Sequence, residues 1–280
     1  MDKRVSKFIY DTFQELFGFM NPYLSNYQKF SQSLSKQIKV KDHNNIQYNF
    51  DVVIDGKIKK NLKAHGITGR IFSEESNFFD NGPKKYRVVY DPFCNSTLAS
   101  KTFLEAAVGI TIFDYDYNFI SSAVMDYQTG IMGIVEDRKT NFYQVQTKRK
   151  LDFSHTSPVK LSESDIVFTL EGKKERKYIA KAQSILTQAN RVLVSSGHYY
   201  WLKLATGKID AYLDPYGGEE LYEMFASAIA HYAGCIVTDI HNKPFDPVFY
   251  LKTFEQDMNF VFYPVAARNK KVHSQLLKSL

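Results

Sequence analysis

Cysteine is scarce in this sequence, whose 280 residues include only Cys94 and Cys235. Two cysteines in a chain of this length do not form a disulfide framework, and their spacing matches no zinc-binding motif. Cys235 stands in an apolar run, which predicts a buried core thiol. Apolar runs long enough to span a bilayer are also missing, so we expect no membrane-spanning segment.

The sequence also lacks the pattern of a secretory signal. Its N-terminus leads into a segment interrupted by Asp11, Gln14 and Glu15, whereas a signal peptide needs an uninterrupted apolar core. We therefore expect a cytoplasmic protein. Internal repeats and low-complexity tracts are missing too, and 44% hydrophobic with 24% charged residues is an ordinary composition for a soluble globular protein.

Acidic residues are fewer than basic ones, 30 against 36, which gives a net charge of +6. The basic residues are spread along the chain, whereas a nucleic-acid-binding surface gathers them on one face. The composition therefore does not favour a nucleic-acid partner. A small anionic ligand suits this charge, and so does the simpler interpretation that solvated lysines keep the protein soluble.

The first part of the chain predicts helices and short strands. Apolar side chains recur at helical spacing over residues 5–20, which predicts an amphipathic helix. Residues 32–50 are polar and predict an irregular segment. The apolar residues 52–54 precede Asp55, and residues 56–62 predict a second helix with a basic face.

Two short apolar runs, at residues 71–72 and 86–90, predict strands that end at acidic residues. Residues 106–146 then alternate in the manner of an antiparallel sheet, with a hairpin turn at 128–130. The length of the chain allows one large domain or two modest ones.

The sequence changes character after residue 160. Continuous apolar runs at 166–170 and 192–194 flank a helical pattern at 178–189, which predicts a sheet buried on both faces. We therefore expect an α+β half over residues 1–145 and an α/β half over residues 146–280. Since no linker is long enough to separate them, we expect the two halves to pack as one unit.

Glu74 and Asp91 each follow one of the predicted strands. Strand ends meet at the edge of a sheet, where sites in layered α/β folds occur. Two carboxylates brought together there bind a hard divalent cation such as Mg²⁺, which needs oxygen ligands. The plainer alternative is that the glutamates are solvated and that Asp91-Pro92 forms a turn.

Three motifs in this order resemble the inositol monophosphatase family of metal-dependent phosphatases. They are Glu74-Glu75-Ser76, Asp91-Pro92-Phe93-Cys94-Asn95-Ser96-Thr97, and Ala233-Gly234-Cys235-Ile236-Val237-Thr238-Asp239. The resemblance extends over about residues 50–267. It implies a mixed α+β and α/β architecture, a layered αβαβα sandwich of the kind shared with fructose-1,6-bisphosphatase.

The resemblance also implies roles for individual residues. Glu74 and Asp91 correspond to metal ligands, and Phe93 would supply a backbone carbonyl to the metal. Ser96 and Asp55 correspond to the pair that activates the attacking water. Residues 96–104 could start a helix with Ser96 or Thr97 near its cap, so that the backbone of Asn95, Ser96 and Thr97 would bind phosphate.

The sequence departs from the family pattern at two metal positions. Cys94 stands where the family has a ligating Asp, and Asn95 replaces the following Gly. A thiolate suits Zn²⁺ better than Mg²⁺, so weakly bound Mg²⁺ is expected, with Zn²⁺ or Mn²⁺ as alternatives. Tyr222 stands where the family has a further Asp, and one of the glutamates beside it, at 219, 220 and 223, could replace that ligand.

The last matching segments concern the substrate. Ala205–Asp214 resembles a family segment in which Asp214 would contact substrate hydroxyls, and Ser196 lies in a segment that lines the pocket. The resemblance implies a small phosphorylated metabolite as ligand and a homodimer as assembly. Two functions follow: a phosphatase for a sugar, inositol or nucleotide monoester, or a pseudoenzyme that binds a phosphorylated ligand or a protein.

Overall fold

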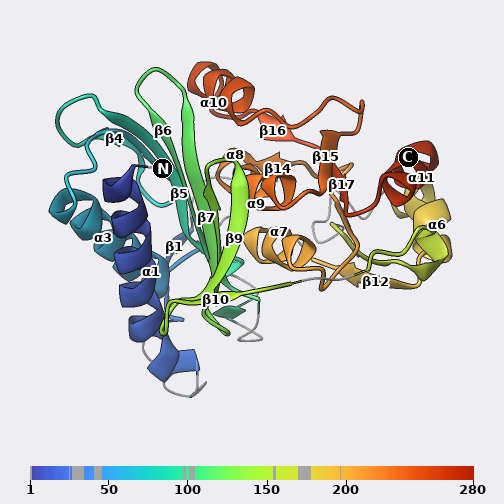
Figure 1. Cartoon of the computed structure of the whole chain (residues 1–280), viewed down its shortest axis with the longest axis horizontal. Helices are drawn as coiled ribbons and strands as arrows, with labels where there is room; N and C mark the ends of the chain where they lie inside the picture. Colours follow the sequence, from blue (N-terminus) through green and yellow to red (C-terminus); the bar gives the residue numbers. More distant parts are fainter. Residues whose placement is uncertain are drawn as a thin grey trace. The chain divides into compact units, whose positions relative to one another are not determined.

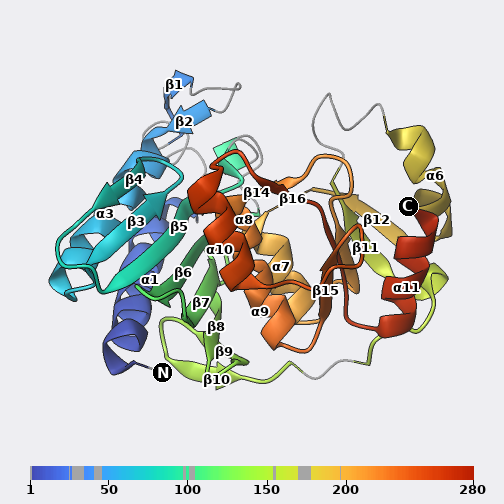
Figure 2. The ribbon, with the colours of Figure 1, turned by 90° about the horizontal axis from the view of Figure 1, so that it is seen from above.

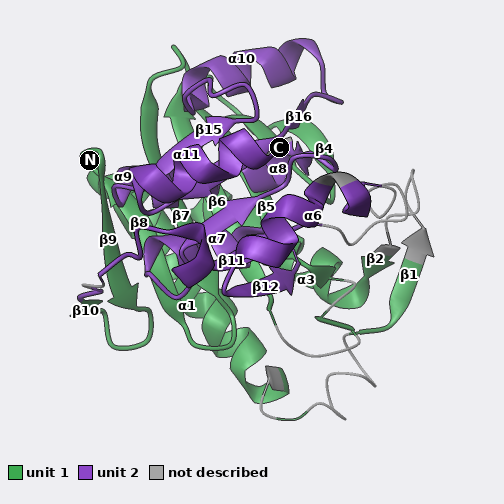
Figure 3. Ribbon diagram, turned by 90° about the vertical axis from the view of Figure 1, so that its right-hand side faces the viewer, with its two compact units in different colours: residues 1–151 green, residues 152–280 purple. Residues whose placement is uncertain are grey.

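The computed structural model describes residues 2–24, 26, 35–40, 46–96, 99–100, 105–153, 156–169, 178–195 and 197–280. The chain forms two compact units, Met1–Leu151 and Asp152–Leu280, shown in green and purple in Figure 3. The first unit reaches Leu151 because strand β10 (Arg149–Leu151) pairs with β9 (Lys139–Gln144). The sequence analysis placed the boundary between the two halves at residue 145.

Helix α1 (Lys3–Leu24) is amphipathic, as the spacing of its apolar residues predicts. Its apolar face is fully buried and consists of Val5, Phe8, Ile9, Phe13, Leu16, Phe17 and Met20. Helix α1 packs beside α3 (Asn49–Ala64), and Figure 1 shows both helices along one face of the large sheet. Together they close the hydrophobic core of the first unit.

Two predictions for residues 32–62 were wrong. The described part of the segment 32–50 includes the antiparallel strands β1 (Gln37–Val40) and β2 (Ile46–Tyr48). Residues 52–54 do not precede a helix but lie inside α3. The helix starts early because its apolar face repeats every fourth residue, at Phe50, Ile54, Ile58 and Leu62.

The large sheet of the first unit has eight strands. Besides β9 and β10 they are β3 (Gly69–Ser73), β4 (Asn77–Asp80), β5 (Tyr86–Cys94), β6 (Ala107–Asp114), β7 (Phe119–Asp126) and β8 (Ile131–Glu136). Their order is β10-β9-β8-β7-β6-β5-β3-β4, and among the described strands of this sheet only β3 and β5 are parallel neighbours. The antiparallel sheet predicted over residues 106–146 is thereby confirmed.

The predicted hairpin turn at 128–130 joins β7 and β8. Gly130 has a φ of 64°, in the left-handed region that favours glycine. A Cβ at this position would also lie 2.8 Å from the ring of Phe17 on α1. The turn therefore requires glycine both for its backbone conformation and for its contact with the helix.

Strand β5 continues past the point where the sequence ended it. The predicted strand stopped at Tyr90, but β5 extends to Cys94 and every one of its residues is buried. Its pairing with β6 is irregular between Asp91 and Cys94. The motif residues therefore lie on a bulged strand end, a geometry that redirects side chains at the edge of a sheet.

The second unit is built on a five-stranded sheet of order β12-β11-β13-β17-β15. The strands are β11 (Asp165–Phe168), β12 (Arg191–Val194), β13 (Ala211–Leu213), β15 (Ile236–Asp239) and β17 (Pro264–Ala267). Neighbours β12, β11 and β13 are parallel, whereas β17 runs antiparallel to β13 and β15.

Helices cover both faces of this sheet, as Figure 2 shows. One face carries alternate residues of the strands against α6 (Ile179–Gln188) and α11 (Lys270–Ser279). The opposite face contacts α7 (His198–Ala205) and α9 (Ser227–Tyr232), where Trp201 and Tyr212 have ring centroids 4.6 Å apart. The prediction of a sheet covered on both faces is confirmed, apart from β12.

Strand β12 is an edge strand, and Leu193 and Val194 on it are 48% and 55% exposed. Apolar composition alone cannot separate such an edge from a central strand. The remaining elements of the unit are η2 (Leu161–Glu163), β14 (Glu219–Glu220), α8 (Leu221–Met224), α10 (Pro247–Gln256) and β16 (Val261–Phe262). Across the described residues, no helix combines the length and hydropathy needed to cross a membrane.

Candidate functional site

The ends of β3 and β5 bring Glu74 and Asp91 together. The two strands are parallel, with Ser73 level with Tyr90, so the residues that follow them lie at the same edge. The backbone N–H of Glu74 donates to the carbonyl of Tyr90 at 3.3 Å, and the carboxyl groups of Glu74 and Asp91 are hydrogen-bonded. The two acidic side chains are therefore held together at this edge of the sheet.

Asp91 is buried, with 1% of its surface exposed. The backbone N–H of Phe93 donates to its Oδ1 at 2.8 Å, and Cys94 also forms a side-chain hydrogen bond with it. Burial raises the pKa of Asp91 to about 6, against the effect of its hydrogen bonds with Glu74 and Phe93. Burial therefore disfavours the ionised form of the Asp91 carboxyl group.

The segment after Asp91 is held by aromatic packing. The ring of Phe93 stacks on Tyr127 with centroids 5.0 Å apart and meets Phe50 at 4.3 Å. The hydroxyl of Tyr127 donates to the carbonyl of Pro92 at 2.8 Å. Phe93 therefore anchors the bulge in the core of the first unit, which fixes the backbone whose carbonyl the sequence assigns to a metal.

Asn95 adopts a φ of 66°, and asparagine is among the few residues other than glycine that tolerate this region. This explains how it replaces the family's glycine. Its side-chain amide donates to the carbonyl of Glu105 at 3.0 Å, and its own carbonyl accepts from the N–H of Ala99 at 2.9 Å. Ser96 follows in helical conformation, and Thr97 lies outside the described residues.

Asp55 accepts hydrogen bonds from three hydroxyl groups. Ser73 and Tyr90 donate to its Oδ1 at 2.8 and 2.6 Å, and Ser76 donates to its Oδ2 at 2.7 Å. Lys59 adds an ion pair with Oδ2 at 2.7 Å. Across the described residues, no direct hydrogen bond joins Asp55 to Ser96, and the pairing of these two residues stays a prediction.

The pKa of Asp55 is lowered. Burial alone would raise the pKa, but the hydrogen bonds from Lys59, Tyr90, Ser76 and Ser73 outweigh it. Asp55 is therefore ionised near neutral pH and ties α3 to the turn after β3 and to β5.

Asp51 is an acidic residue of this region that sequence reasoning missed. It lies in the first turn of α3 and is 1% exposed. Burial raises its pKa well above the usual value, and the charges of Glu75, Glu74 and Asp91 act in the same direction. An acidic residue in the first turn of a helix would have been the sequence signal. The helix was predicted to begin at residue 56, so Asp51 was not recognised as part of it.

Asp214 and Ser196 are the substrate residues predicted in the second unit. Asp214 is buried, and its Oδ1 accepts from the N–H of Gly217 at 2.9 Å. One carboxylate oxygen of Asp214 therefore stabilises the turn that contains Gly217. Ser196 lies outside the described residues.

Tyr222 stands at the position of the family's further Asp, and a neighbouring glutamate was predicted to replace that ligand. Tyr222 packs its ring against Phe254, with centroids 5.6 Å apart, and its carbonyl accepts from His198 at 2.9 Å. Of the neighbouring glutamates, Glu219 is buried and accepts from Trp201 at 3.0 and 3.2 Å and from Tyr212. Burial raises the pKa of Glu219 to about 8.

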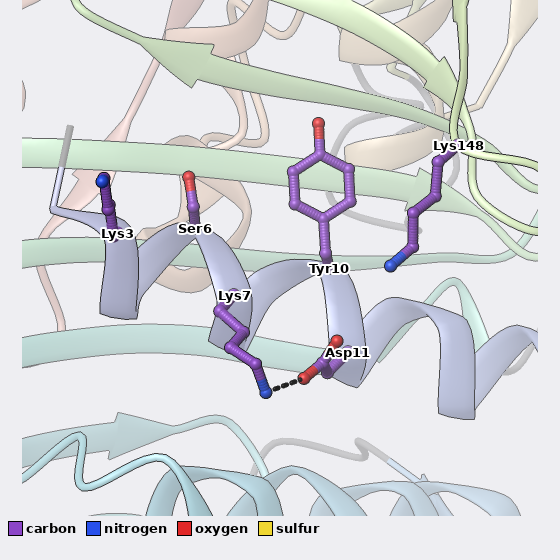
Figure 4. Close-up of a pocket in the computed structure, with 6 residues that line it drawn as sticks. All are labelled: Lys3, Ser6, Lys7, Tyr10, Asp11 and Lys148. Atoms are coloured by element: carbon purple, nitrogen blue, oxygen red, sulfur yellow. Dashed lines mark hydrogen bonds and ion pairs between the residues drawn. The ribbon is translucent and has the colours of Figure 1, made fainter.

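A surface pocket of about 410 Å³ lies on α1 and the turn before β10, as Figure 4 shows. Its Lys7 and Asp11 form an ion pair at 3.0 Å. None of the predicted site residues lines this pocket, whose walls consist of Lys3, Ser6, Lys7, Tyr10, Asp11 and Lys148. We therefore place the candidate site at the ends of β3 and β5.

No protein-family model and no curated protein sequence matches the chain. Solved structures match it nearly end to end. The extragenic suppressor protein SuhB from Bartonella henselae aligns with a TM-score of 0.77 at 14% identity, covering 98% of this chain and 97% of its own. The chain has the inositol monophosphatase fold.

Two further structures with this fold come from Staphylococcus aureus. An inositol monophosphatase family protein aligns with a TM-score of 0.74 at 13% identity, covering 99% of this chain and 95% of its own. Inositol monophosphatase II aligns with a TM-score of 0.69 at 13% identity, covering 98% and 92%. The fold expected from the three motifs is thereby confirmed, with helices on one sheet face in the first unit and on both faces in the second.

The first unit offers oxygen donors of the kind that the divalent cation implied by the resemblance requires. Glu74 and Asp91 offer carboxylate oxygens, which Mg²⁺ prefers. One buried oxygen of Asp51, Oδ1, lacks a hydrogen-bond partner across the described residues, and a cation would satisfy it. Cys94 offers a buried thiol instead of a carboxylate, so the donor set at its position is softer than Mg²⁺ favours.

Proposed function

We propose that the protein is a metal-dependent phosphatase that hydrolyses a phosphate monoester of a sugar, inositol or nucleotide. The observation that carries this proposal is the pairing of the half-buried Glu74 with the buried Asp91 at the ends of two parallel strands. Two acidic groups held close together, one of them buried, gain stability when a cation binds between them. The fold supports the same class of function.

Glu74, Asp91 and the backbone carbonyl of Phe93 would hold the metal. A bound Mg²⁺ supplies charge stabilisation and polarisation to a phosphoryl group. The aromatic packing of Phe93 keeps the carbonyl and Asp91 in fixed relation, so the ligands need little rearrangement. Cys94 contributes less negative charge than Asp would, which supports weak Mg²⁺ binding, with Mn²⁺ or Zn²⁺ as alternatives.

Asn95, Ser96 and Thr97 remain the proposed phosphate-binding residues, and Ser96 with Asp55 the proposed water-positioning pair. A carboxylate with a lowered pKa is a weak proton acceptor near neutral pH. We therefore propose that Asp55 acts through orientation, by holding the turn that carries Ser73 and Ser76.

The proposed substrate class rests on the neighbours in fold. One solved structure is a dual-specific inositol monophosphatase and NADP phosphatase bound to D-inositol-1-phosphate, and another is a staphylococcal inositol monophosphatase complexed with products. For this chain we propose a small phosphorylated metabolite, with Asp214 and Ser196 as substrate contacts.

The test is phosphate release from inositol 1-phosphate, fructose 1,6-bisphosphate and NADP in the presence of Mg²⁺, Mn²⁺ or Zn²⁺. We expect release with at least one substrate and a loss of at least about a hundredfold in Asp91→Asn, because that variant removes a ligand charge. Asp246→Asn, an exposed helix cap, is the matched control and should retain full activity. Equal release by the wild type and Asp91→Asn would contradict the proposal.

A second candidate function is binding without catalysis, and the ion pair between Lys59 and Asp55 favours it. An acidic side chain already neutralised by an internal ammonium group is less available to orient water. In that case the protein would bind a phosphorylated ligand or a protein partner. Thermal stabilisation by Mg²⁺ with phosphate, without phosphate release from any substrate, would support this function.

A further inference from the structure

We propose that Glu219 is a positioning residue for substrate binding, because it holds the start of α7 and the turn after β13 in one fixed arrangement. The start of α7 is Gly197, which follows Ser196 in the sequence, and the turn begins at Asp214. Ser196 and Asp214 are the two proposed substrate contacts. The inference rests on the proposed function, concerns the second unit alone, and gives Glu219 a role other than that of a replacement metal ligand.

Glu219 is enclosed by hydrogen-bond donors from two different elements, and only 1% of its surface is exposed. The indole N–H of Trp201 on α7 donates to both carboxyl oxygens, at 3.0 and 3.2 Å. The hydroxyl of Tyr212 on β13 donates to Oε1. Trp201 and Tyr212 are themselves fully buried. The carboxyl group of Glu219 therefore joins α7 to β13 in the interior of the second unit.

The hydroxyl of Tyr212 extends this connection to the first residue of α7. The backbone N–H of Gly197 donates to the hydroxyl oxygen at 3.4 Å. Because Tyr212 gives its own proton to Glu219, its oxygen is left to accept from Gly197. Gly197 is the N-cap of α7 and, as a glycine, offers no side chain to cap the helix. Tyr212 and Glu219 together therefore fix the backbone at the point where α7 begins.

The turn from Asp214 to Glu219 is the second segment held in place. Asp214 directly follows β13, and its Oδ1 accepts from the N–H of Gly217 at 2.9 Å. Glu219 then enters β14, which pairs with β16. Burial raises the pKa of Tyr212, and the charges of Glu219 and Asp214 add to this effect. Both ends of the turn therefore lie near the side chain of Tyr212.

Packing alone does not account for a glutamate at position 219. Burial raises its pKa, and the charge of Asp214 acts in the same direction, so its ionised form is disfavoured there. An apolar side chain of similar volume would avoid this cost. It would not, however, accept hydrogen bonds from Trp201 and Tyr212 or fix the orientation of these two side chains. The carboxyl group thus selects one arrangement of α7, β13 and the turn.

The consequence concerns substrate binding rather than the chemical step. The residues proposed to hold the metal and to position the water belong to the first unit, whereas Asp214 and Ser196 belong to the second. Loss of the hydrogen bonds of Glu219 should therefore weaken contacts with the bound substrate. Such a loss raises KM and leaves kcat nearly unchanged.

The experiment compares Glu219→Leu, Glu219→Gln and Tyr212→Phe in the phosphate-release assay with Mg²⁺. Leucine removes the acceptor, glutamine keeps an oxygen that accepts, and phenylalanine interrupts the connection to Gly197. We expect KM to rise about tenfold in Glu219→Leu and Tyr212→Phe with kcat within about twofold of wild type, and Glu219→Gln to keep the wild-type KM. Tyr250→Phe is the control, since Tyr250 is a buried tyrosine that stacks on Phe245 in the same unit, and its KM should not change.

A second readout does not require catalysis. Hydrogen exchange in protein labelled with ¹⁵N-glycine follows the amide of Gly197, which we expect to exchange about tenfold faster in Tyr212→Phe and Glu219→Leu. Gly207 is the internal control, because its N–H donates to Leu204 at 3.1 Å at the other end of α7. Equal acceleration at both glycines would mean that the variants merely loosen the helix and would overturn the inference. Should Glu219→Leu fail to fold, Tyr212→Phe alone decides.

The outcome is separate from that of the proposed hydrolysis. If the wild type releases phosphate from no substrate, the proposed hydrolysis fails, and calorimetric binding of inositol 1-phosphate with Mg²⁺ replaces KM. Weaker binding in Tyr212→Phe and Glu219→Leu than in wild type would then still support the inference. Equal binding, or no binding by the wild type, would overturn it. In an active protein, an unchanged KM or a loss confined to kcat would overturn the inference and leave the hydrolysis standing.

Discussion

Lys59 and Asp55 form an ion pair one helical turn apart on α3, with Nζ 2.7 Å from Oδ2. The ammonium group also donates to Ser76 at 2.5 Å and lies 5.1 Å from the centroid of Phe79. The pair therefore joins the helix to the turn after β3. Its strength decides whether Asp55 is a structural anchor or a group available for catalysis.

Lys59→Met tests this pair through the decrease in the free energy of unfolding at low pH. Because the pKa of Asp55 is lowered in the folded protein, its contribution is present above about pH 4, the unfolded value, and is lost as pH falls through the folded value. Removing Lys59 should raise the pKa of Asp55 and move this loss to higher pH. Lys59 is 36% exposed, so we expect a loss of only about 1 kcal/mol at neutral pH.

Chemical denaturation between pH 3 and pH 7 measures the effect of Lys59→Met. Lys7→Met is the control, because Lys7 also forms an i,i+4 pair, with Asp11 at 3.0 Å, but is 70% exposed. If the free energy of unfolding decreases with falling pH in the same way in Lys59→Met and in Lys7→Met, the ion pair of Lys59 adds nothing to the anchoring of Asp55.

Tyr90→Phe should destabilise the first unit. Tyr90 is fully buried, and its hydroxyl donates to Asp55 at 2.6 Å. The variant removes a hydrogen bond to a buried carboxylate, so we expect a decrease of about 1.5–3 kcal/mol in the free energy of unfolding. Tyr86→Phe loses a similar bond to Asp2, at 2.7 Å, near the N-terminus and should lose less. Equal losses in urea denaturation would refute the special role of Tyr90.

Glu219→Gln should change how stability depends on pH. Burial raises the pKa of Glu219 to about 8, so the folded state binds the extra proton between about pH 4.5 and pH 8. Its contribution is complete below about pH 4.5 and is lost as pH rises through about 8. The amide cannot ionise and still accepts from Trp201, so the variant should gain stability relative to wild type as pH rises.

The measurement for Glu219→Gln is the difference in free energy of unfolding from wild type at pH 5 and pH 8.5. Glu220→Gln is the matched control, because Glu220 is the next residue in the sequence and its side chain is exposed. A difference that stays constant with pH would mean that Glu219 is ionised in the folded protein throughout.

Cys94→Asp should strengthen Mg²⁺ binding, because it adds a carboxylate beside Asp91. Without metal the extra buried charge should lower the unfolding temperature. With saturating Mg²⁺ we expect stabilisation larger than in wild type, and a tenfold gain in affinity corresponds to about 1.4 kcal/mol. Cys235→Ala, at the other buried cysteine, controls for the loss of a thiol. The same Mg²⁺-induced shift in all three proteins would show that position 94 faces no metal.

Local patterns predicted much of the secondary structure. The apolar spacing of α1 and the alternation across β6–β9 were read correctly, because each pattern follows from the geometry of a single element. The early start of α3, the extension of β5 and the exposed edge position of β12 were missed. These depend on what each segment packs against, and propensity does not contain that information.

The sequence by itself determined the order of the motifs, and with it the fold and the candidate acids Glu74 and Asp91. Only the tertiary structure decided the surroundings of the other acidic groups: Tyr90 beside Asp55, the buried Oδ1 of Asp51 without a hydrogen-bond partner in the described part of the chain, and Glu219 enclosed by Trp201 and Tyr212. The physical reason is that a carboxyl group's charge state depends on burial and on neighbours far away in the sequence. A residue's identity is local, whereas its electrostatic surroundings arise only when the chain folds.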